Sequence, residues 1–511
     1  MGAGASGAAG GAWCSVKRYR TASCLFLLTA GALLVHGYHP YAEDAEIYLP
    51  GVEKILNPNL FPVLREFFAS HASLTLFPNL IAFSIRVTHL PFETGLFLWH
   101  VASIFLLLLA CWELGGMCFA SARARWGGVC LVAALLTIPV AGTALYIMDQ
   151  YLNPRNLAAF AAIFAVTRTL ESKYARALLW LVFAACVHPL MAAFAFSFCF
   201  LLVFMKYAEG RRADAGAGIK IASAGALDCL LFPFGIFLDP PSSPAYHEAA
   251  LRHGFHYIQR WQWYEQFGIL APVLLFWWFG RMARARGSRN LDLLCRAFII
   301  YDLIYFVMAL GLDLPGRFES LARLQPLRSL HLLYMAMFVV MGGFLAEYAL
   351  QNRLWRWLAL FVPLSAGMFA AQLALFPASA HVDWPGVRPR NQWAQAFVWI
   401  RENTPVDAVF ALNPEYMHIP GEDEIGFRCL AQRSRLADAN KDNGVVSMFP
   451  PLAEKWLEQV KAQTPWKNLS ALDFARLKQT YSVDWVVVQQ PGVAGLDCAY
   501  QNGAVQVCRV P

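Results

Sequence analysis

The chain has 511 residues, of which 58% are hydrophobic and only 15% charged, and its formal net charge is +7. Soluble domains are nearer a quarter charged, and a membrane barrel would show short alternating strands instead of the continuous apolar runs found here. The composition therefore predicts a mainly α, polytopic helical membrane protein. Membrane lipids are its expected surroundings, and nothing points to nucleic acid as a partner.

The N-terminal part predicts a first membrane span. Residues 1–20 are Gly/Ala-rich at their start and carry Lys17, Arg18 and Arg20, and an apolar run at 21–37 follows. A signal peptide has the same order of basic and apolar regions, but no convincing small-x-small cleavage site follows this run. We therefore expect a disordered cytoplasmic N-terminus at 1–20 and an uncleaved first span.

A transmembrane domain at 21–376 is predicted from the apolar runs. One of them, 177–205, is too long for a single crossing of the ~30 Å hydrocarbon core, and His188-Pro189 at its centre breaks the helix. It therefore predicts a hairpin of two short helices with His188 near its tip. About eleven spans result, and the runs after the first lie near 95–118, 127–147, 156–170, 177–205, 219–238, 266–281, 293–312, 328–347 and 355–376.

The basic residues predict the orientation of these spans. Arg123 and the arginines of 281–289 mark cytoplasmic loops, which places the first loop, 38–94, on the extracytoplasmic side. A competing arrangement makes 74–90 a span and 177–205 a single tilted helix. That arrangement puts several basic residues outside, so we expect 74–90 to be an interfacial or re-entrant segment.

Residues 385–511 are more polar and are expected to form a small extracytoplasmic α/β domain. Cys498 and Cys508 flank its hairpin-like end, CAYQNGAVQVC, and need a bulge to pair because the register about the turn is off by one. The domain has no glycine-rich phosphate loop and no nucleophile elbow, which favours a structural or substrate-covering role. Its predicted elements are a helix at 391–403, a strand at 408–412, amphipathic helices near 450–462 and 470–481, a strand at 484–489 and the final hairpin.

Acidic residues gather directly after the first span, in the stretch HPYAEDAEIYLPG at 39–51. In the simplest interpretation, Glu43, Asp44 and Glu46 are solvated, inert carboxylates at a helix end. The alternative is a reactive site, because one acid can hold a proton or a divalent metal while another acts as a base. The amphipathic stretch that follows would bring these acids back to the membrane surface, where a lipid-linked substrate presents its headgroup. No cofactor is certain, and a divalent metal stays open.

The same stretch resembles the first periplasmic loop of GT-C glycosyltransferases, polytopic enzymes that take a sugar from a polyprenyl-phosphate donor. The acids after the first span, Tyr48 four residues after Asp44, the amphipathic stretch and a proline carry the resemblance. It implies that Asp44 is the catalytic base, or holds the acceptor or a divalent metal. Ala45 departs from the aminoarabinose-transferase type, which has Glu directly after the Asp, and leaves Glu43 and Glu46 as competitors for the second acidic role.

Three arginines and a histidine are candidates for binding the donor phosphate. Arg155 follows an Asn-Pro helix start, and a solvated arginine at a capped connection is the simpler interpretation. Arg323 and Arg328 lie on the outer side, where the positive-inside rule disfavours them, and their planar forks match phosphate; pairing with carboxylates is the alternative. His188 is a secondary candidate because ionisable residues within the membrane are costly.

The sequence thus predicts a glycosyltransferase of a bacterial inner membrane that moves a sugar from a polyprenyl-phosphate lipid to an unknown extracytoplasmic acceptor. The stretch GFRCLAQRSRLADANKD looks like the tail of uncharacterised bacterial membrane proteins with a GT-C-like core, and it names no substrate. A lipid-carrier or solute transporter is an alternative of another class, and it would show internal repeats and midplane charges. A non-catalytic GT-C-like assembly partner is the third possibility, because position 45 lacks an acid.

Overall fold

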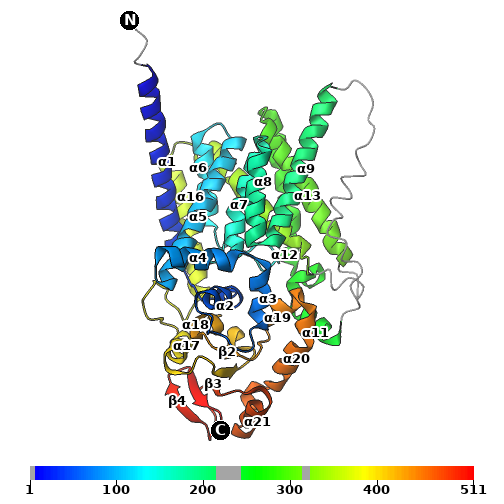
Figure 1. Ribbon diagram of the computed structural model, residues 1–511. Helices are drawn as coiled ribbons and strands as arrows, with labels where there is room; N and C mark the ends of the chain where they lie inside the picture. Colours follow the sequence, from blue (N-terminus) through cyan, green and yellow to red (C-terminus); the bar gives the residue numbers. More distant parts are fainter. Residues whose placement is uncertain (1–5, 215–242, 313–322) are drawn as a thin grey trace.

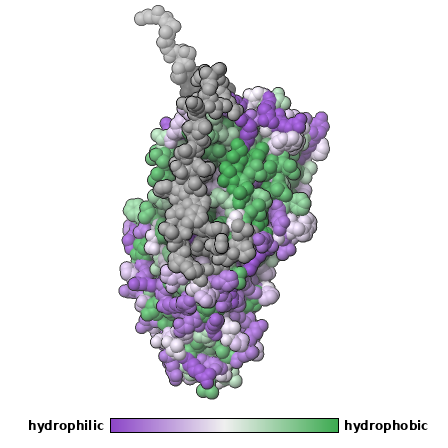
Figure 2. Space-filling model, turned by 90° about the vertical axis from the view of Figure 1, so that its right-hand side faces the viewer, coloured by the Kyte–Doolittle hydropathy of each residue, from purple (hydrophilic) through white to green (hydrophobic). Residues whose placement is uncertain are grey.

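The molecule has two parts, a bundle of long helices and a smaller α/β domain beneath it (Figure 1). The computed structural model describes residues 6–214, 243–312 and 323–511. Apolar side chains gather over the bundle, and hydrophilic ones cover the α/β domain and the opposite rim (Figure 2). The predicted class, a mainly helical membrane protein with a small C-terminal sheet domain, is confirmed.

The bundle contains the helices that could cross a membrane. They are α1 (Ser6–His36), α5 (Phe92–Cys118), α6 (Ala122–Ala134), α7 (Pro154–Leu170), α8 (Tyr174–Val187), α9 (Pro189–Asp214), α12 (Trp263–Ala285), α13 (Arg289–Leu312), α15 (Leu330–Leu345) with the preceding turn η4 (Pro326–Ser329) and the following turn η5 (Ala346–Leu350), and α16 (Leu354–Leu375). Among the described residues, seven helices are long and apolar enough to span, or eight if one bent pair in the first loop counts as one span. The expected number of about eleven is not confirmed, because α6, α7 and α8 have only 13, 17 and 14 residues and the run 219–238 lies outside the described residues.

The run 177–205 forms the predicted hairpin. His188 ends α8 and Pro189 begins α9, because proline suits a helix start, where no N–H is needed. Near the other end of α9, Lys206 Nζ donates to the backbone oxygen of Leu170 at the end of α7, 2.9 Å away. Both outer ends of the hairpin therefore lie at one end of the bundle, and its tip lies at the other. With 26 residues, α9 is longer than the short helix that was expected.

The end of the bundle away from the α/β domain is rich in arginine. Arg168 pairs with Glu171 at 2.7 Å where α7 meets α8, and Arg286, after α12, pairs with Glu347 after α15. These connections contain the basic residues that predicted the cytoplasmic side. They lie at the opposite end of the helices from the acidic stretch around Asp44.

One expectation about the N-terminus is wrong. Helix α1 begins at Ser6, so the segment 6–20, which was expected to be disordered, is helical. Helix propagation adds one hydrogen bond for each residue fixed, and the apolar span at 21–37 provides the helix that extends backward through this alanine-containing segment.

Short helices fill the loop between α1 and α5. They are α2 (Ala45–Leu56), α3 (Glu66–Leu74) and α4 (Phe77–Thr88). α2 buries one apolar face, with Leu49 and Val52 fully covered. α3 and α4 meet at 85°, and the 12-residue α4 lies across the ends of the bundle helices (Figure 1). Because 12 residues cover only about 18 Å of a ~30 Å core, this arrangement favours the interfacial interpretation of 74–90.

A five-stranded sheet forms the centre of the α/β domain. Its strands are β1 (Val409–Leu412), β2 (Ser434–Arg435), β3 (Trp485–Gln489), β4 (Asp497–Gln501) and β5 (Val505–Arg509). Their order is β2-β1-β3-β5-β4; β1 is parallel to β2 and β3, and the other pairs are antiparallel. The near-continuous apolar sequence of β3, WVVVQ, is typical of a strand buried on both faces.

Helices surround this sheet. They are α17 (Gln392–Asn403), α18 (Arg428–Ala431), α19 (Lys441–Met448), α20 (Ala453–Ala462) and α21 (Ala471–Tyr481), and α11 (Pro244–Arg252) from the preceding part of the chain packs against α19 and α20. Every helix and strand that the sequence predicted for this region is present. Strand β2 and helices α18 and α19 were not predicted, because two to eight residues are too few for a periodic pattern.

Cys498 and Cys508 form a disulfide across the hairpin of β4 and β5. The two residues are paired in the sheet register, and the register shifts between Cys498 and Tyr500. This irregularity is the predicted bulge, which brings the two cysteines opposite each other.

Candidate active site

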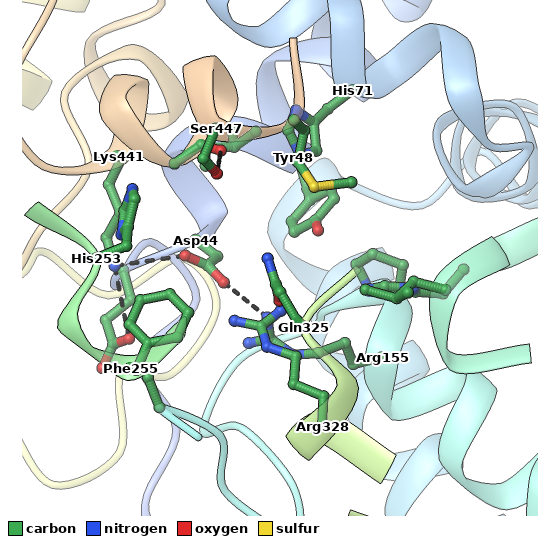
Figure 3. A pocket seen from close by; sticks show the side chains of 18 of the residues that line it. Asp44, Tyr48, His71, Arg155, His253, Phe255, Gln325, Arg328, Lys441 and Ser447 are labelled. Carbon is green, nitrogen blue, oxygen red and sulfur yellow. Dashed lines mark hydrogen bonds and ion pairs between the residues drawn. The ribbon is translucent and has the colours of Figure 1, made fainter. Parts of the chain in front are cut away.

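A cavity of about 360 Å³ lies where the bundle, the first loop and the α/β domain meet (Figure 3). Pockets of this size hold small ligands or the headgroups of larger ones. Its walls come from α2 and α3, from the tip of the α8–α9 hairpin, from the starts of α7 and η4, and from the α/β domain. Its polar lining residues are Glu43, Asp44, Tyr48, His71, Thr75, Arg155, His188, His253, Gln325, Arg328, His418, Glu424, Asn440, Lys441 and Ser447.

Asp44 directs its carboxylate into this cavity from the residue before α2 (Figure 3). Arg155 Nη1 donates to its Oδ2 at 2.9 Å, and Lys441 Nζ lies 3.4 Å from its Oδ1. Burial alone would raise the pKa of Asp44, but Lys441 and Arg155 outweigh burial and hold the pKa well below its ordinary value. Asp44 is therefore ionised at neutral pH, which suits orienting a hydroxyl better than removing its proton.

Glu43 lines the same cavity and has the opposite character. Its backbone is left-handed, with φ 50°, which is uncommon for a residue with a side chain, and its N–H donates to the Glu424 carbonyl at 2.7 Å. Burial raises the pKa of Glu43 to about 7, although Lys441 opposes the rise. Of the two acids, Glu43 has the proton affinity that suits a general base near neutral pH.

Arg155 lies beside Asp44 at the start of α7. Asn153 caps α7 by accepting from the Arg155 N–H at 2.9 Å, and Pro154 occupies the first helical position. The Arg155 guanidinium also donates to Asp149 at 3.2 Å. Two carboxylates thus hold this arginine at the positive end of a helix.

Arg328 differs from Arg155 because its side chain forms no ion pair or hydrogen bond with any described residue. It extends into the cavity from η4, its Nε is buried without a partner, and its guanidinium lies 5.3 Å from the centre of the Phe255 ring (Figure 3). Gln325, one turn earlier, has a left-handed backbone with φ 46°, and its buried Oε1 also has no partner in the described chain. Unpaired buried polar groups are costly and need an explanation, and a bound anion supplies one for Arg328.

Of the four remaining candidate residues, two line the cavity and two do not. Tyr48 and His188 line the cavity, Tyr48 from α2 and His188 from the tip of the hairpin. Arg323 precedes η4 and is not among the lining residues. Glu46 is not among them either, and its surroundings are those of a structural residue.

Glu46 joins the first loop to the α/β domain. It is fully buried, and its carboxylate accepts from the Arg428 backbone N–H at 2.7 Å and from Arg435 Nη2 at 2.8 Å. Asp442 accepts hydrogen bonds from Nη1 and Nη2 of Arg428, each at 2.8 Å, and extends the network. The prediction that Glu46 could act at the reactive site needs correction: on helix α2 it points away from the cavity, whereas Glu43 and Asp44 precede the helix and point into it.

The α/β domain supplies cavity residues that the sequence did not reveal. Asn440 precedes α19 and Lys441 begins it, while His418, at the end of the 3-10 turn η6 (Tyr416–His418), and Glu424 lie between β1 and α18. His71 from α3 also lines the cavity and was not predicted. These residues come from short helices and loops without a recognisable motif, so only the charge-rich stretch RSRLADANKD could have drawn attention to one of them.

The donor set of the cavity does not fit the divalent metal that the sequence left open. No cluster of three or more His, Cys, Asp or Glu side chains suited to a metal ion occurs within 6–214, 243–312 and 323–511. Glu43, Asp44 and Glu424 come together in the cavity, and the ammonium group of Lys441 lies among these carboxylates.

Together these features define a polytopic helical membrane protein in which an α/β domain covers a charged cavity at one end of the bundle. The structure is similar to the archaeal oligosaccharyltransferase AglB from Archaeoglobus fulgidus in complex with an inhibitory peptide and a dolichol-phosphate, with 11% identity, a TM-score of 0.47, and 93% of this chain and 70% of that chain covered. It is also similar to the apo form of an oligosaccharyltransferase from the same organism, with 12% identity, a TM-score of 0.45, and 91% and 69% covered. These neighbours have the GT-C fold. No family model matches the chain, and no curated protein matches it significantly.

Proposed function

We propose that this chain is a GT-C-type glycosyltransferase that moves a sugar from a polyprenyl-phosphate donor to an acceptor bound in the cavity. One observation carries the proposal: the ionised Asp44 and the buried Arg328, whose side chain pairs with no residue in the described part of the chain, face one cavity at the end of an apolar helical bundle. A buried guanidinium without a counter-charge is unfavourable until an anion arrives. Transfer from a lipid phosphate needs an anion site of this kind beside an acidic one.

The donor phosphate binds at Arg328 in this proposal. The planar fork of the arginine matches two phosphate oxygens, and the N-terminus of α7, with Arg155, adds positive potential beside it. When the bond between phosphate and the anomeric carbon breaks, the negative charge that remains on the phosphate is neutralised by these groups. With the phosphate in this position, the polyprenyl chain extends out of the cavity along the bundle and passes near His188 at the hairpin tip.

The acceptor lies on the acidic side of the cavity. Asp44 orients the acceptor group by accepting a hydrogen bond, and Glu43 takes its proton as the new bond to the anomeric carbon forms. Tyr48, on the first turn of α2, borders the space between the acids and Arg328 (Figure 3). The two acids thus divide orientation and proton transfer between them.

The proposal includes an orientation in the membrane. Because positively charged connections stay in the cytoplasm, the arginine-rich end of the bundle is the cytoplasmic one and the cavity with the α/β domain is extracytoplasmic. The disulfide between Cys498 and Cys508 supports this, since disulfides persist in oxidising compartments. A bacterial inner membrane, with the α/β domain facing the cell envelope, fits both features.

The replacement Arg328→Gln tests the donor site. We expect the KM for a polyprenyl-phosphate sugar to rise about 10- to 100-fold, because a hydrogen bond to a charged group contributes roughly 1.5–3 kcal/mol. The melting temperature should not fall, because Arg328 has no ion pair with a described residue to lose. Transfer of radiolabelled sugar from the lipid, measured with the purified protein in detergent, checks the first point, and thermal unfolding checks the second.

A matched control is Arg353→Gln, which makes the same change at an exposed position at the other end of the bundle. An unchanged donor KM in Arg328→Gln would contradict the phosphate site. A wild-type protein that binds the lipid but forms no sugar-containing product would favour the transporter alternative, and one that does neither would favour a non-catalytic partner.

The assignment of Glu43 predicts the pH dependence of transfer. Because its pKa is raised to about 7 by burial, the base is protonated and inactive below that value, and kcat should rise as the pH increases through 7. The variant Glu43→Gln should be slow and should lose this limb of the pH–rate profile. Persistence of the same limb in Glu43→Gln would assign the proton transfer to another group.

A further inference from the structure

Lys441 is the group around which the acidic residues of the cavity converge. Its Nζ lies 3.4 Å from Asp44, 3.5 Å from Glu424 and 3.6 Å from Glu43. Two of these acids belong to the first loop and one to the α/β domain, so the ammonium group connects the two parts of the chain. Its side chain is only 11% exposed, which makes it a buried cation with three partners instead of a surface lysine.

The place of Lys441 in its own helix is unfavourable without these acids. It is the first residue of α19, where the helix dipole disfavours a positive charge. The next residue, Asp442, accepts hydrogen bonds from Nη1 and Nη2 of Arg428, and this contact fixes the first turn of α19 against the rest of the domain. The fold therefore holds a cation at a helix end that repels it, and the carboxylates of the cavity provide the compensation.

A divalent cation and this ammonium group cannot share the position. Oxygen ligands lie about 2.0–2.6 Å from Mg²⁺ or Ca²⁺. The three carboxylates lie 3.4–3.6 Å from the lysine nitrogen, a separation typical of an ammonium ion pair. Bringing a metal to the same carboxylates requires that the lysine first be removed from among them.

We infer that Lys441 is the built-in cation of this acidic cluster and takes the place that a divalent metal would otherwise occupy, so that the site works without one. Lys441 is a positioning residue: it holds Asp44 in its orientation and joins Glu43 and Glu424 without contacting the reacting atoms. The statement about transfer rests on the function proposed above. The statement about cation binding concerns this chain alone and needs no substrate.

Binding of Mn²⁺ alone to the full-length protein in detergent tests the inference. Carboxylate oxygens suit Mn²⁺, and we expect an affinity like that of weak extracellular Ca²⁺ sites, about 10⁻⁴–10⁻³ M. We expect calorimetry to show no saturable Mn²⁺ binding to the wild type or to Lys441→Arg, which keeps the charge. Lys441→Ala should bind one Mn²⁺ in this range and should melt at a higher temperature with Mn²⁺ than with EDTA. Adding Glu424→Gln to Lys441→Ala should abolish both effects.

The outcomes are distinct. Saturable Mn²⁺ binding to the wild type that is lost in Glu424→Gln would overturn the inference, and so would the absence of binding in a folded Lys441→Ala protein. If transfer is detected, it should be unaffected by EDTA in the wild type, and a requirement for metal there would also overturn it. Failure to detect transfer in any variant would count against the proposed function and leave the binding result to stand by itself.

Discussion

Replacement of Asp44 by asparagine is expected to lower the rate of sugar transfer by about 10²-fold or more, the loss that misplacing a reacting group causes. Asparagine has the same shape but no charge, so Lys441 and Arg155 lose the carboxylate that they share. The acceptor group would then lose the ionised carboxylate that orients it. The measurement is the transfer of radiolabelled sugar from a polyprenyl-phosphate donor at saturating donor and acceptor concentrations.

The expected loss is one of function and not of folding. Arg155 keeps Asp149 at 3.2 Å, and Lys441 keeps Glu43 and Glu424, so the network around the cavity remains connected. Asp407→Asn, the same chemical change at an exposed position of the α/β domain, is the control and should transfer at the wild-type rate. Wild-type transfer by Asp44→Asn would remove Asp44 from the mechanism.

Replacement of Glu46 by glutamine is expected to have the largest effect on stability, about 3 kcal/mol or more. Its carboxylate accepts four hydrogen bonds from Arg428 and Arg435. Glutamine keeps only one acceptor oxygen and turns an NH₂ group toward these donors, so hydrogen bonds worth roughly 1.5–3 kcal/mol each are lost although Asp438 and Asp442 still pair with the arginines. Because this contact joins α2 to the α/β domain, the domain should separate from the bundle before the bundle unfolds. Thermal unfolding and limited proteolysis of the 376–391 connection would both detect this.

Glu53→Gln provides a control on the same helix. Glu53 is also buried, but its partner is the neutral Gln432, which donates to Oε1 at 3.1 Å. Burial raises the pKa of Glu53 well above its ordinary value, which favours the neutral carboxyl that glutamine resembles. Glu53→Gln should leave the melting temperature within a degree or two, whereas equal effects of the two replacements would show that burial, and not the arginines, makes Glu46 important.

The sequence by itself determined the membrane class, the hairpin at 177–205 and most elements of the α/β domain. These features leave local patterns: apolar runs long enough for helices, a proline at a helix break and alternation along a strand. Neighbouring residues also revealed the start of α7 at Asn153-Pro154 and the pairing of Cys498 with Cys508, since both depend on a few positions. The number of spans could not be predicted as well from the sequence, because short buried helices are not long enough to cross the membrane.

Only the tertiary structure decided which charges meet. Glu43 and Glu46 are three residues apart and looked equivalent, yet the start of α2 between them directs one into the cavity and the other against Arg428 and Arg435. Lys441 lies about 400 residues after Asp44 and reaches it through the packing of the α/β domain on the first loop. Contacts between distant segments leave no period in the sequence, because they depend on how whole elements pack and not on which residues are neighbours in the chain.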